Sequence, residues 1–447
     1  MFTNWKLILG LAIPSVVSFA SATVTGTINL IMVGHMGALV IAIVGVSNII
    51  CYNAWALCSG IGNSINYLVA QNYGAGDMKK GIQRTYIALY LCLAVVLLIL
   101  LAGYAAPGAI LRLMGGSEEL VAAGTDYLCL RLYAVAATTA GFVFHGFFRG
   151  IGDTRTPMVL SLAGNAAMIG FTYVLTYGRF GFPELGLWGA GLAVLLGELV
   201  NVIGCMYVYF VRLHRRFGTR ARVASDRAEA KLIAAESGKL GMQEVAMSLS
   251  MFVFTMFVTR LGTHALAANE VALNVMSFGF MPAFAFGATA TILVGQEIGK
   301  GQPLEARRMG TDVAVLGSLF LFVLGLAEFV FAGPVARIYT DDPAVYELTA
   351  QLIRISAFMQ IFDGLLNFYA GGLRGIGDTT FLLRTSFLLS WLVFIPLTYA
   401  LTFMLDLHSV GSWIALYAFL ALFAVSVMLR FYRTDWSAVV IKEAGHG

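Results

Sequence analysis

Five acidic residues lie inside long apolar stretches of the chain: Glu198, Glu244, Glu270, Glu328 and Asp363. A charged side chain at the centre of a membrane-inserted helix costs about 2.5–3.5 kcal/mol, so such residues are candidates for binding protons, cations or charged substrates. Asp363 is the strongest candidate, because Gln360 and Asn367 lie about one helical turn away on either side. We expect Asp363 to bind a cation, H⁺ or Na⁺. Glu198 and Glu328 stand alone in apolar surroundings, which is also typical of packed, protonated acids.

Two other acids have polar or interfacial surroundings that favour a supporting role. Glu270 lies in the stretch LAANEVALN, beside Asn269 and Asn274. Glu244 lies close to the beginning of its apolar stretch. We expect both carboxylates to assist Asp363 in binding the cation or the substrate.

The composition predicts that membrane helices position these residues. The chain is 59% hydrophobic and 12% charged, whereas soluble proteins carry about 25% charged residues. Apolar runs of about 20 residues, enough to cross a bilayer, recur throughout. Backbone groups in lipid must be hydrogen-bonded within the protein, and the alternation typical of a barrel is absent from these runs, so we predict an all-α integral membrane protein. The first apolar run resembles a signal peptide, but we expect it to be the first membrane helix.

An internal repeat organises the chain. The hexapeptide RGIGDT occurs at 149–154 and at 374–379, and Gly37 and Arg112 recur at the same offset as Gly262 and Arg337. Matching landmarks of this kind indicate two homologous halves. Breaks at glycine, proline and charged clusters divide each half into six helices, and an even number gives both halves the same orientation, as parallel repeats. The twelve predicted helices are 5–34, 39–71, 82–106, 119–149, 156–178, 187–212, 240–260, 264–296, 304–333, 344–374, 381–404 and 409–432.

This division predicts four regions and an orientation. We expect a first six-helix bundle over 1–211, a solvated basic linker over 212–239, a second bundle over 240–433 and a tail over 434–447. The side that holds the termini carries 22 of the 28 lysines and arginines. Basic residues concentrate on the cytoplasmic side of membrane proteins, so we expect both termini in the cytoplasm and the protein in the plasma or inner membrane.

The repeated hexapeptide is expected to be structural. Its glycines allow a tight turn, and Asp153 and Asp378 are suited to cap the next helix. Arg149 and Arg374 are suited to bind lipid headgroups, helix carbonyls or the adjacent aspartate. A phosphate-binding loop would need a Walker-type Lys-Ser/Thr, which is absent from the motif. We therefore expect no ATP hydrolysis, no enzyme activity and no cofactor other than a coupling ion.

Six motifs together make the chain resemble one transporter family: IMVGHMG at 31–37, LVAQNYGAGD at 68–77, FFRGIGDTRTP at 147–157, LAANEVALNV at 266–275, FMPAFAFGATATILVGQEIG at 280–299 and GGLRGIGDTTF at 371–381. The chain is similar to the multidrug and toxic compound extrusion (MATE) transporters over essentially its whole length. The resemblance implies two six-helix bundles around a central cleft that opens alternately to either side. It also implies exchange of H⁺ or Na⁺ for small organic, often cationic and amphiphilic, compounds.

The resemblance also implies roles for single residues. The family's tenth-helix carboxylate matches Asp363, while its seventh-helix glutamate falls near Met247, with Glu244 one turn away. The first-helix aspartate of the family is Asn29 here, and two polar positions of the fifth helix are Met168 and Thr172. We expect the first-half cation site to be largely missing. The residues expected to line the substrate cleft are Asn29, Met247, Met251, Asn274, Met359, Gln360 and Asn367.

Three other functions stay open at this point. A lipid or lipid-linked oligosaccharide flippase of the same superfamily would favour a basic cleft, but the membrane stretches contain few basic residues. An integral-membrane enzyme would need clustered histidines or acids, whereas the histidines are scattered. A channel would conduct passively. The expected partners are small organic molecules and membrane lipids, without nucleic acid, and the expected state is a monomer.

Overall fold

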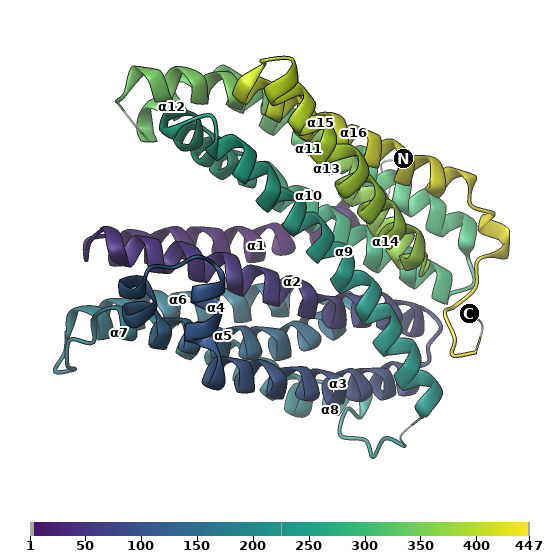
Figure 1. Cartoon of the computed structure of the whole chain (residues 1–447). Helices are drawn as coiled ribbons and strands as arrows, with labels where there is room; N and C mark the ends of the chain where they lie inside the picture. Colours follow the sequence, from purple (N-terminus) through teal and green to yellow (C-terminus); the bar gives the residue numbers. More distant parts are fainter. Residues whose placement is uncertain (1–3, 225, 340, 446–447) are drawn as a thin grey trace. The chain divides into compact units, whose positions relative to one another are not determined.

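The computed structural model describes residues 4–224, 226–339 and 341–445, and its regular elements over these ranges are helices (Figure 1). Within these ranges, eleven helical spans are long and apolar enough to cross a membrane, and α13 adds a further long helix. The twelve spans confirm the predicted fold class. Their bounds are α1 (Trp5–Gly34), α2 (Ala38–Gly74), α3 (Met78–Ala105), α5 (Glu118–Gly150), α6 (Arg155–Tyr177), α7 (Gly186–Tyr207), α9 (Arg227–Thr259), α10 (Thr263–Gly299), α11 (Pro303–Val330), α13 (Pro343–Gly375), α14 with α15 (Thr379–Leu388 and Ile395–Tyr399) and α16 (His408–Arg433).

Short helices and π-helical turns complete these spans. The short α-helices are α4 (Pro107–Leu113), α8 (His214–Phe217) and α12 (Ala332–Tyr339). The π-helical turns are Val208–Arg212, Leu389–Phe394 and Ala400–Met404, and a 3₁₀ turn covers Trp436–Ala438. The last two π-helical turns flank α15, so α14 and α15 belong to one continuous span, Thr379–Met404.

By its internal contacts the chain divides into two compact units, each of which is described by itself. The N-terminal unit comprises Val17–Tyr73, Asp77–Gly241 and Glu443–Gly447. The C-terminal unit comprises Met1–Val16, Gly74–Gly76 and Met242–Lys442. The beginning of α1 therefore packs with the second half of the sequence, where Ile8, Leu11 and Ala12 enter the hydrophobic core. The expected bundle limits at 211 and 240 describe the sequence repeat and stay a prediction.

The two RGIGDT segments form the same turn. Gly152 and Gly377 both have φ of 81°, a left-handed conformation that favours glycine. The amide of Asp153 donates to the carbonyl of Phe148 at 2.9 Å, and the amide of Asp378 donates to that of Leu373 at 3.0 Å. The repeat seen in the sequence is therefore also a repeat of backbone geometry at the end of α5 and of α13.

The aspartates of the two turns make different contacts. Asp153 accepts hydrogen bonds from the Thr156 amide at 3.0 Å and hydroxyl at 2.6 Å, which confirms the expected helix cap. For Asp378 the expectation is wrong, because its side chain makes no capping bond to α14. Its Oδ2 instead accepts from Nε of Arg430 on α16 at 2.7 Å. This ion pair joins the turn to the last helix of the C-terminal unit.

The arginines of the motif lie inside the protein rather than among lipid headgroups. Arg149 is 4% exposed, and its guanidinium lies 4.9 Å from the ring centroid of Phe19 and 5.5 Å from that of Phe142. Arg374 is 7% exposed. Burial of both side chains indicates that they stabilise the turn from within, so the headgroup alternative is not supported.

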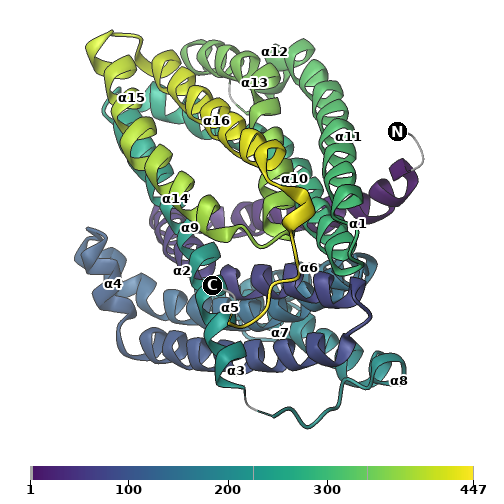
Figure 2. The same ribbon diagram turned by 90° about the vertical axis from the view of Figure 1, so that its right-hand side faces the viewer.

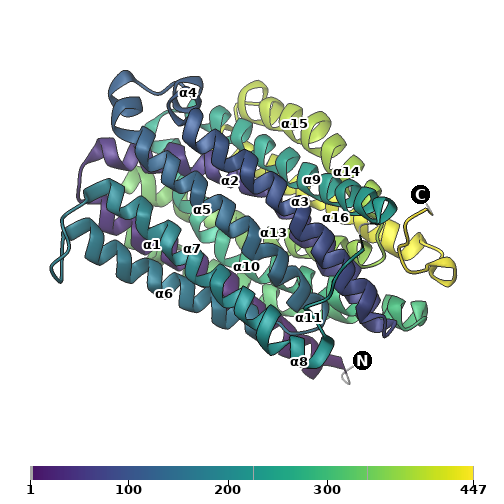
Figure 3. The same ribbon diagram turned by 90° about the horizontal axis from the view of Figure 1, so that it is seen from below.

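Glycine contacts bring the central helices of each unit together. A Cβ added to Gly371 of α13 would lie 2.1 Å from the carbonyl oxygen of Gly287 on α10. At the same repeat offset, a Cβ on Gly146 of α5 would lie 2.3 Å from the carbonyl oxygen of Gly62 on α2. Figure 2 labels the helices α10 and α13, and Figure 3 labels α2 and α5. Small residues allow such close backbone approach in membranes, where helices associate by packing. These two contacts fix α5 and α13, and α13 carries Asp363, the strongest candidate side chain.

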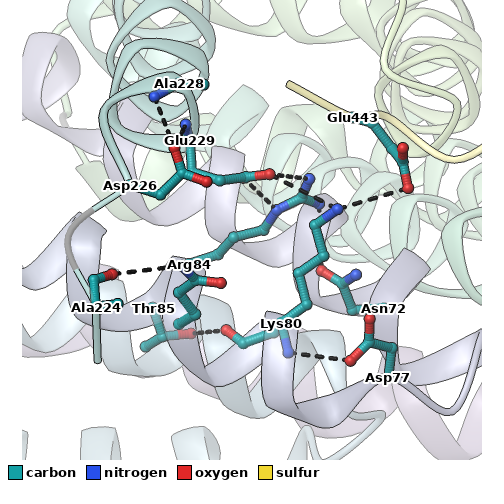
Figure 4. Close-up of polar contacts among 12 residues, drawn as sticks. Asn72, Asp77, Lys80, Arg84, Thr85, Ala224, Asp226, Ala228, Glu229 and Glu443 are labelled. Carbon is teal, nitrogen blue, oxygen red and sulfur yellow. Dashed lines mark hydrogen bonds and ion pairs between the residues drawn. The ribbon is translucent and has the colours of Figure 1, made fainter. Parts of the chain in front are cut away.

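The second part of the basic linker is helical and partly buried, so its expected solvation is wrong there. Helix α9 begins at Arg227, and the side chain of Glu229 in its first turn meets Arg84 of α3 (Figure 4). Nε of Arg84 donates to Oε2 of Glu229 at 2.8 Å, and the Arg84 side chain is fully buried. Lys80 also lies near Glu229, at 3.7 Å, and reaches Glu443 of the tail at 3.5 Å.

The Arg84–Glu229 pair provides a test of what holds the linker to the N-terminal unit. Arg84→Met leaves Glu229 buried without its main cation, so we expect unfolding to become easier by about 3–5 kcal/mol. Lys80→Met is the matched control, and we expect a loss below about 1 kcal/mol because its ion pairs are more exposed. The double variant Arg84→Met/Glu229→Met should recover most of the loss. Thermal unfolding in detergent measures all three, and equal effects of the two single variants would contradict the assignment.

The glycine contacts give a second prediction. Gly371→Ala forces α13 away from Gly287, and overpacking of this kind costs about 1–3 kcal/mol. Gly170 of α6 is a matched helical glycine, because a Cβ there meets nothing within 4 Å. We expect Gly371→Ala to lower the melting temperature and Gly170→Ala to leave it unchanged or higher. A neutral Gly371→Ala would show that the two backbones have room to separate.

Candidate functional site

Asp363 lies on α13 in the interior of the C-terminal unit, where its residue is 7% exposed. Its Oδ1 accepts a hydrogen bond from the side-chain amide of Asn367 at 3.2 Å. The same side-chain nitrogen also donates to the backbone carbonyl of Asp363 at 2.8 Å. Among the described residues, the ion pairs do not include Asp363. The carboxylate is thus oriented by a neutral neighbour and, among the described residues, forms no ion pair that would balance its charge.

A second carboxylate belongs to the same polar cluster. Gln360 lies one turn before Asp363. When its side-chain amide is oriented so that both its nitrogen and its oxygen form hydrogen bonds, the nitrogen donates to Oε2 of Glu328 on α11 at 3.2 Å. In that orientation its oxygen accepts from the amide of Gly325 at 3.1 Å. Glu328 is therefore connected to the α13 site through Gln360 and is not the isolated acid that its apolar stretch indicated.

Tyr417 of α16 completes this cluster and was missed in the sequence. Its buried side chain interacts electrostatically with both Asp363 and Glu328. A single tyrosine in an apolar helix is too common to stand out. Only the packing of α16 against α13 brings it within electrostatic range of the two acids.

The remaining sequence candidates of the C-terminal unit lie elsewhere. Glu270 is on the exposed side of α10, next to the buried Asn269, which accepts a hydrogen bond from Nε1 of Trp413 at 2.9 Å. Asn274 is exposed, one turn further along α10. In the described part of the chain, no hydrogen bond or ion pair joins Glu270 to Asp363.

Glu244 is close to a different charge. It lies on α9, and its strongest charged neighbour is Arg374 of the repeated turn. Arg374 follows Asp363 on α13 by about three helical turns. The structure therefore places Glu244 at the turn and not beside Asp363.

The methionines expected to line the cleft have two kinds of environment. Met247 and Met251 of α9 are partly buried against the hydrophobic core of the C-terminal unit. Met359 of α13 is exposed. The packing of the first two is that of ordinary core residues.

The N-terminal unit contains a cavity of about 210 Å³. Its lining includes Asn29, Met168 and Thr172, the three positions at which the first-half cation site was expected to be depleted. The two charged residues in the lining are Arg131 and Glu198. Glu198, like Glu328, is therefore part of a polar site, and sequence reasoning did not connect it with Arg131. Their separation in sequence gives no signal that both residues line one cavity.

The acids do not form a transition-metal site. Across residues 4–224, 226–339 and 341–445, no three histidine, cysteine, aspartate or glutamate side chains come together as metal ligands. The Asn367 side chain presents its nitrogen to Asp363, and Gln360 contacts Glu328 and Gly325. The carboxylate of Asp363 is itself the type of oxygen ligand that hard cations prefer.

Comparisons with known proteins agree with this architecture. The MatE family model matches twice, over residues 14–174 and 240–400, which covers well over half of the chain. The chain is 26% identical over 442 residues to a probable multidrug resistance protein NorM of Thermotoga maritima, covering 98% of this chain and 95% of that one. It is 27% identical to the multidrug resistance protein MdtK of Yersinia enterocolitica, covering 99% and 98%.

Solved structures show the same fold. An outward-facing multidrug resistance MATE family transporter matches with a TM-score of 0.89 at 20% identity, over 97% of this chain and 96% of that one. A MATE structure in complex with MaD3S matches with a TM-score of 0.88 at 21% identity and the same coverage. Two matches to one family model, in the two halves that share the RGIGDT turn, show that the chain belongs to the MATE family of multi-pass membrane transporters and is not an enzyme.

Proposed function

We propose that this transporter exports small organic, amphiphilic cations in exchange for H⁺ or Na⁺, and that both compete for Asp363. One observation carries the proposal: Asp363 is a buried carboxylate with a neutral amide as its hydrogen-bond partner and no ion pair among the described residues. A buried charge without a partner is costly, so the ionised carboxylate favours whichever cation reaches it. The names of the relatives, multidrug resistance proteins, support organic substrates.

Competition at one carboxylate gives a simple exchange cycle. When Asp363 is ionised, it attracts a cationic substrate from the inner side. A proton or Na⁺ that arrives from the outer side neutralises the carboxylate and releases the substrate. Each state of the site binds one of the two, so movement of one is coupled to movement of the other.

Glu328 and Tyr417 are proposed as supporting groups. Two nearby carboxylates resist being ionised together, so Glu328 restrains the charge of the cluster to a value that one cation can balance. The Tyr417 hydroxyl supplies a neutral oxygen near both acids. We assign Glu244 a structural role at the Arg374 turn in place of the expected direct help to Asp363.

We further propose that both termini lie in the cytoplasm of the plasma or inner membrane and that the transporter acts as a monomer. The excess of lysine and arginine on the side of the termini supports this orientation. Small organic compounds and surrounding lipids are then its partners.

The role of Asp363 is tested in proteoliposomes with an imposed gradient. Asp363→Asn removes the charge while keeping the size and the contact to Asn367, so we expect uphill efflux of a fluorescent organic cation to fall to background. Glu244→Gln is the matched control and should keep efflux close to wild type. Separate Na⁺ and pH gradients identify the coupling ion.

Melting temperatures of both variants in detergent exclude unfolding as the cause. Wild-type efflux by Asp363→Asn would contradict the assignment of the site. Movement of a labelled lipid by the wild-type protein, without movement of the organic cation, would favour the flippase alternative.

A further inference from the structure

The cavity of the N-terminal unit carries an arginine whose charge is not balanced by an ion pair. Arg131 lies on α5, thirteen residues after Glu118 and thus about 20 Å from the beginning of that helix. It lines the cavity together with Tyr127 of the same helix and residues of α1, α2, α6 and α7, among them Asn29, Asn48 and Glu198. A cation so far inside a membrane helix is expensive, which makes it a candidate for function.

Two neutral groups hold one edge of the guanidinium. Nη1 of Arg131 donates to Oδ1 of Asn48 at 2.8 Å and to the Tyr127 hydroxyl at 2.9 Å. The guanidinium carbon lies 5.7 Å from the centre of the Tyr127 ring. These contacts come from α2 and α5, so they fix the direction of the side chain without neutralising it.

The opposite edge of the guanidinium is available. Within the part of the chain that the structure describes, the hydrogen bonds of Arg131 use Nη1 alone, and no carboxylate lies within 4.0 Å of its nitrogens. Glu198 lines the same cavity but lies beyond that distance. The Nε and Nη2 groups present two parallel N–H donors, the arrangement that binds both oxygens of a carboxylate.

The size and charge of the cavity restrict what fits. A volume of about 210 Å³ is below the roughly 300–1,000 Å³ of sites that enclose whole drug-sized ligands. It suits one end group, such as a benzoate, with the rest of the molecule outside. Glu198 also lines the cavity and, when ionised, repels a second anionic group on the ligand and attracts a cationic one.

We propose that this cavity binds the carboxylate of an amphiphilic organic monoanion or zwitterion through Nε and Nη2 of Arg131. The site differs from Asp363 in the sign of the charge it recognises and lies in the other unit. The inference extends the proposed export function, on which it rests, to carboxylate-bearing substrates. Arg131 is then the residue that selects them.

The test uses two dyes that differ in one group. Rhodamine B carries a free carboxylate on its phenyl ring, and its ethyl ester has the same cationic ring system without that charge. Fluorescence polarisation measures binding of each dye to the full-length protein in detergent. We expect Arg131→Gln to weaken binding of rhodamine B by about tenfold to a hundredfold, the range of a hydrogen-bonded charge, and to leave ester binding within about twofold. Arg131→Lys should keep part of the preference.

A second variant leaves Arg131 in place. Asn29→Asp adds a carboxylate to the lining at nearly constant size. It should therefore weaken binding of rhodamine B but not binding of its ester. Loss of ester binding by Arg131→Gln would show that this variant does not fold. In that case Asn29→Asp alone tests whether the cavity binds the carboxylate. The proposal would be overturned if Asn29→Asp weakened binding of both dyes equally, or if either variant bound rhodamine B as the wild type does. It would also be overturned if the wild-type protein bound only the ester.

The binding test is independent of ion coupling. It needs no gradient, so failure of the exchange mechanism at Asp363 would leave its result intact. In Asp363→Asn, binding of rhodamine B and of its ester should change by the same factor, because both dyes carry the cationic ring system that Asp363 attracts. Loss of the difference between the two dyes in that variant would place carboxylate recognition outside the N-terminal cavity and overturn the assignment.

Discussion

The free energy required to keep a charge away from water governs where the ionisable side chains of this transporter lie. An uncompensated buried charge costs several kcal/mol, so a buried charge needs an ion pair or other polar partners. The buried Arg84 meets Glu229 at 2.8 Å. Asp363 and Arg131 have neutral hydrogen-bond partners instead. The Arg84–Glu229 pair stabilises the fold, whereas Asp363 and Arg131 remain able to bind a charged ligand.

The duplicated scaffold allows the two halves to differ in chemistry. The turns at Gly152 and Gly377 have the same φ, and the contacts of Gly146 with Gly62 and of Gly371 with Gly287 recur at one offset. Side chains that do not contribute to these contacts are free to diverge. Asp363 corresponds to Thr138, and Arg131 corresponds to Ser356. The equivalent helices α13 and α5 therefore carry an acid in one half and an arginine in the other.

The sequence predicts the helices well and their polar contacts poorly. Apolar length and the repeat offset are local or self-consistent signals, so spans such as 5–34 and 381–404 nearly match the helices observed. The beginning of α9 at Arg227 was not predicted, because the charged residues of this segment indicated a solvated linker. Burial of Glu229 depends on Arg84, 145 residues earlier, and no local pattern shows that pairing.

The candidate sites show the same difference between local signals, which the sequence contains, and long-range contacts, which it does not. Asp363 was identifiable because one charge in an apolar run is visible in sequence alone. The links from Glu328 to Gln360 and from Arg131 to Asn48 join different helices, so they exist only after packing. The different use of Asp153 and Asp378, in identical hexapeptides, likewise depends on the presence of Arg430 near one of them.

The Arg84–Glu229 pair also has a consequence for the order in which the chain is made. Arg84 leaves the ribosome 145 residues before Glu229. Until the beginning of α9 is synthesised, the N-terminal end of α3 holds a guanidinium that lacks its buried partner, so it stays in contact with water. Six inserted helices are therefore not yet a finished folding unit. The N-terminal unit closes only when translation has passed the linker, which makes residues 17–241, and not the first bundle alone, the natural fragment to express.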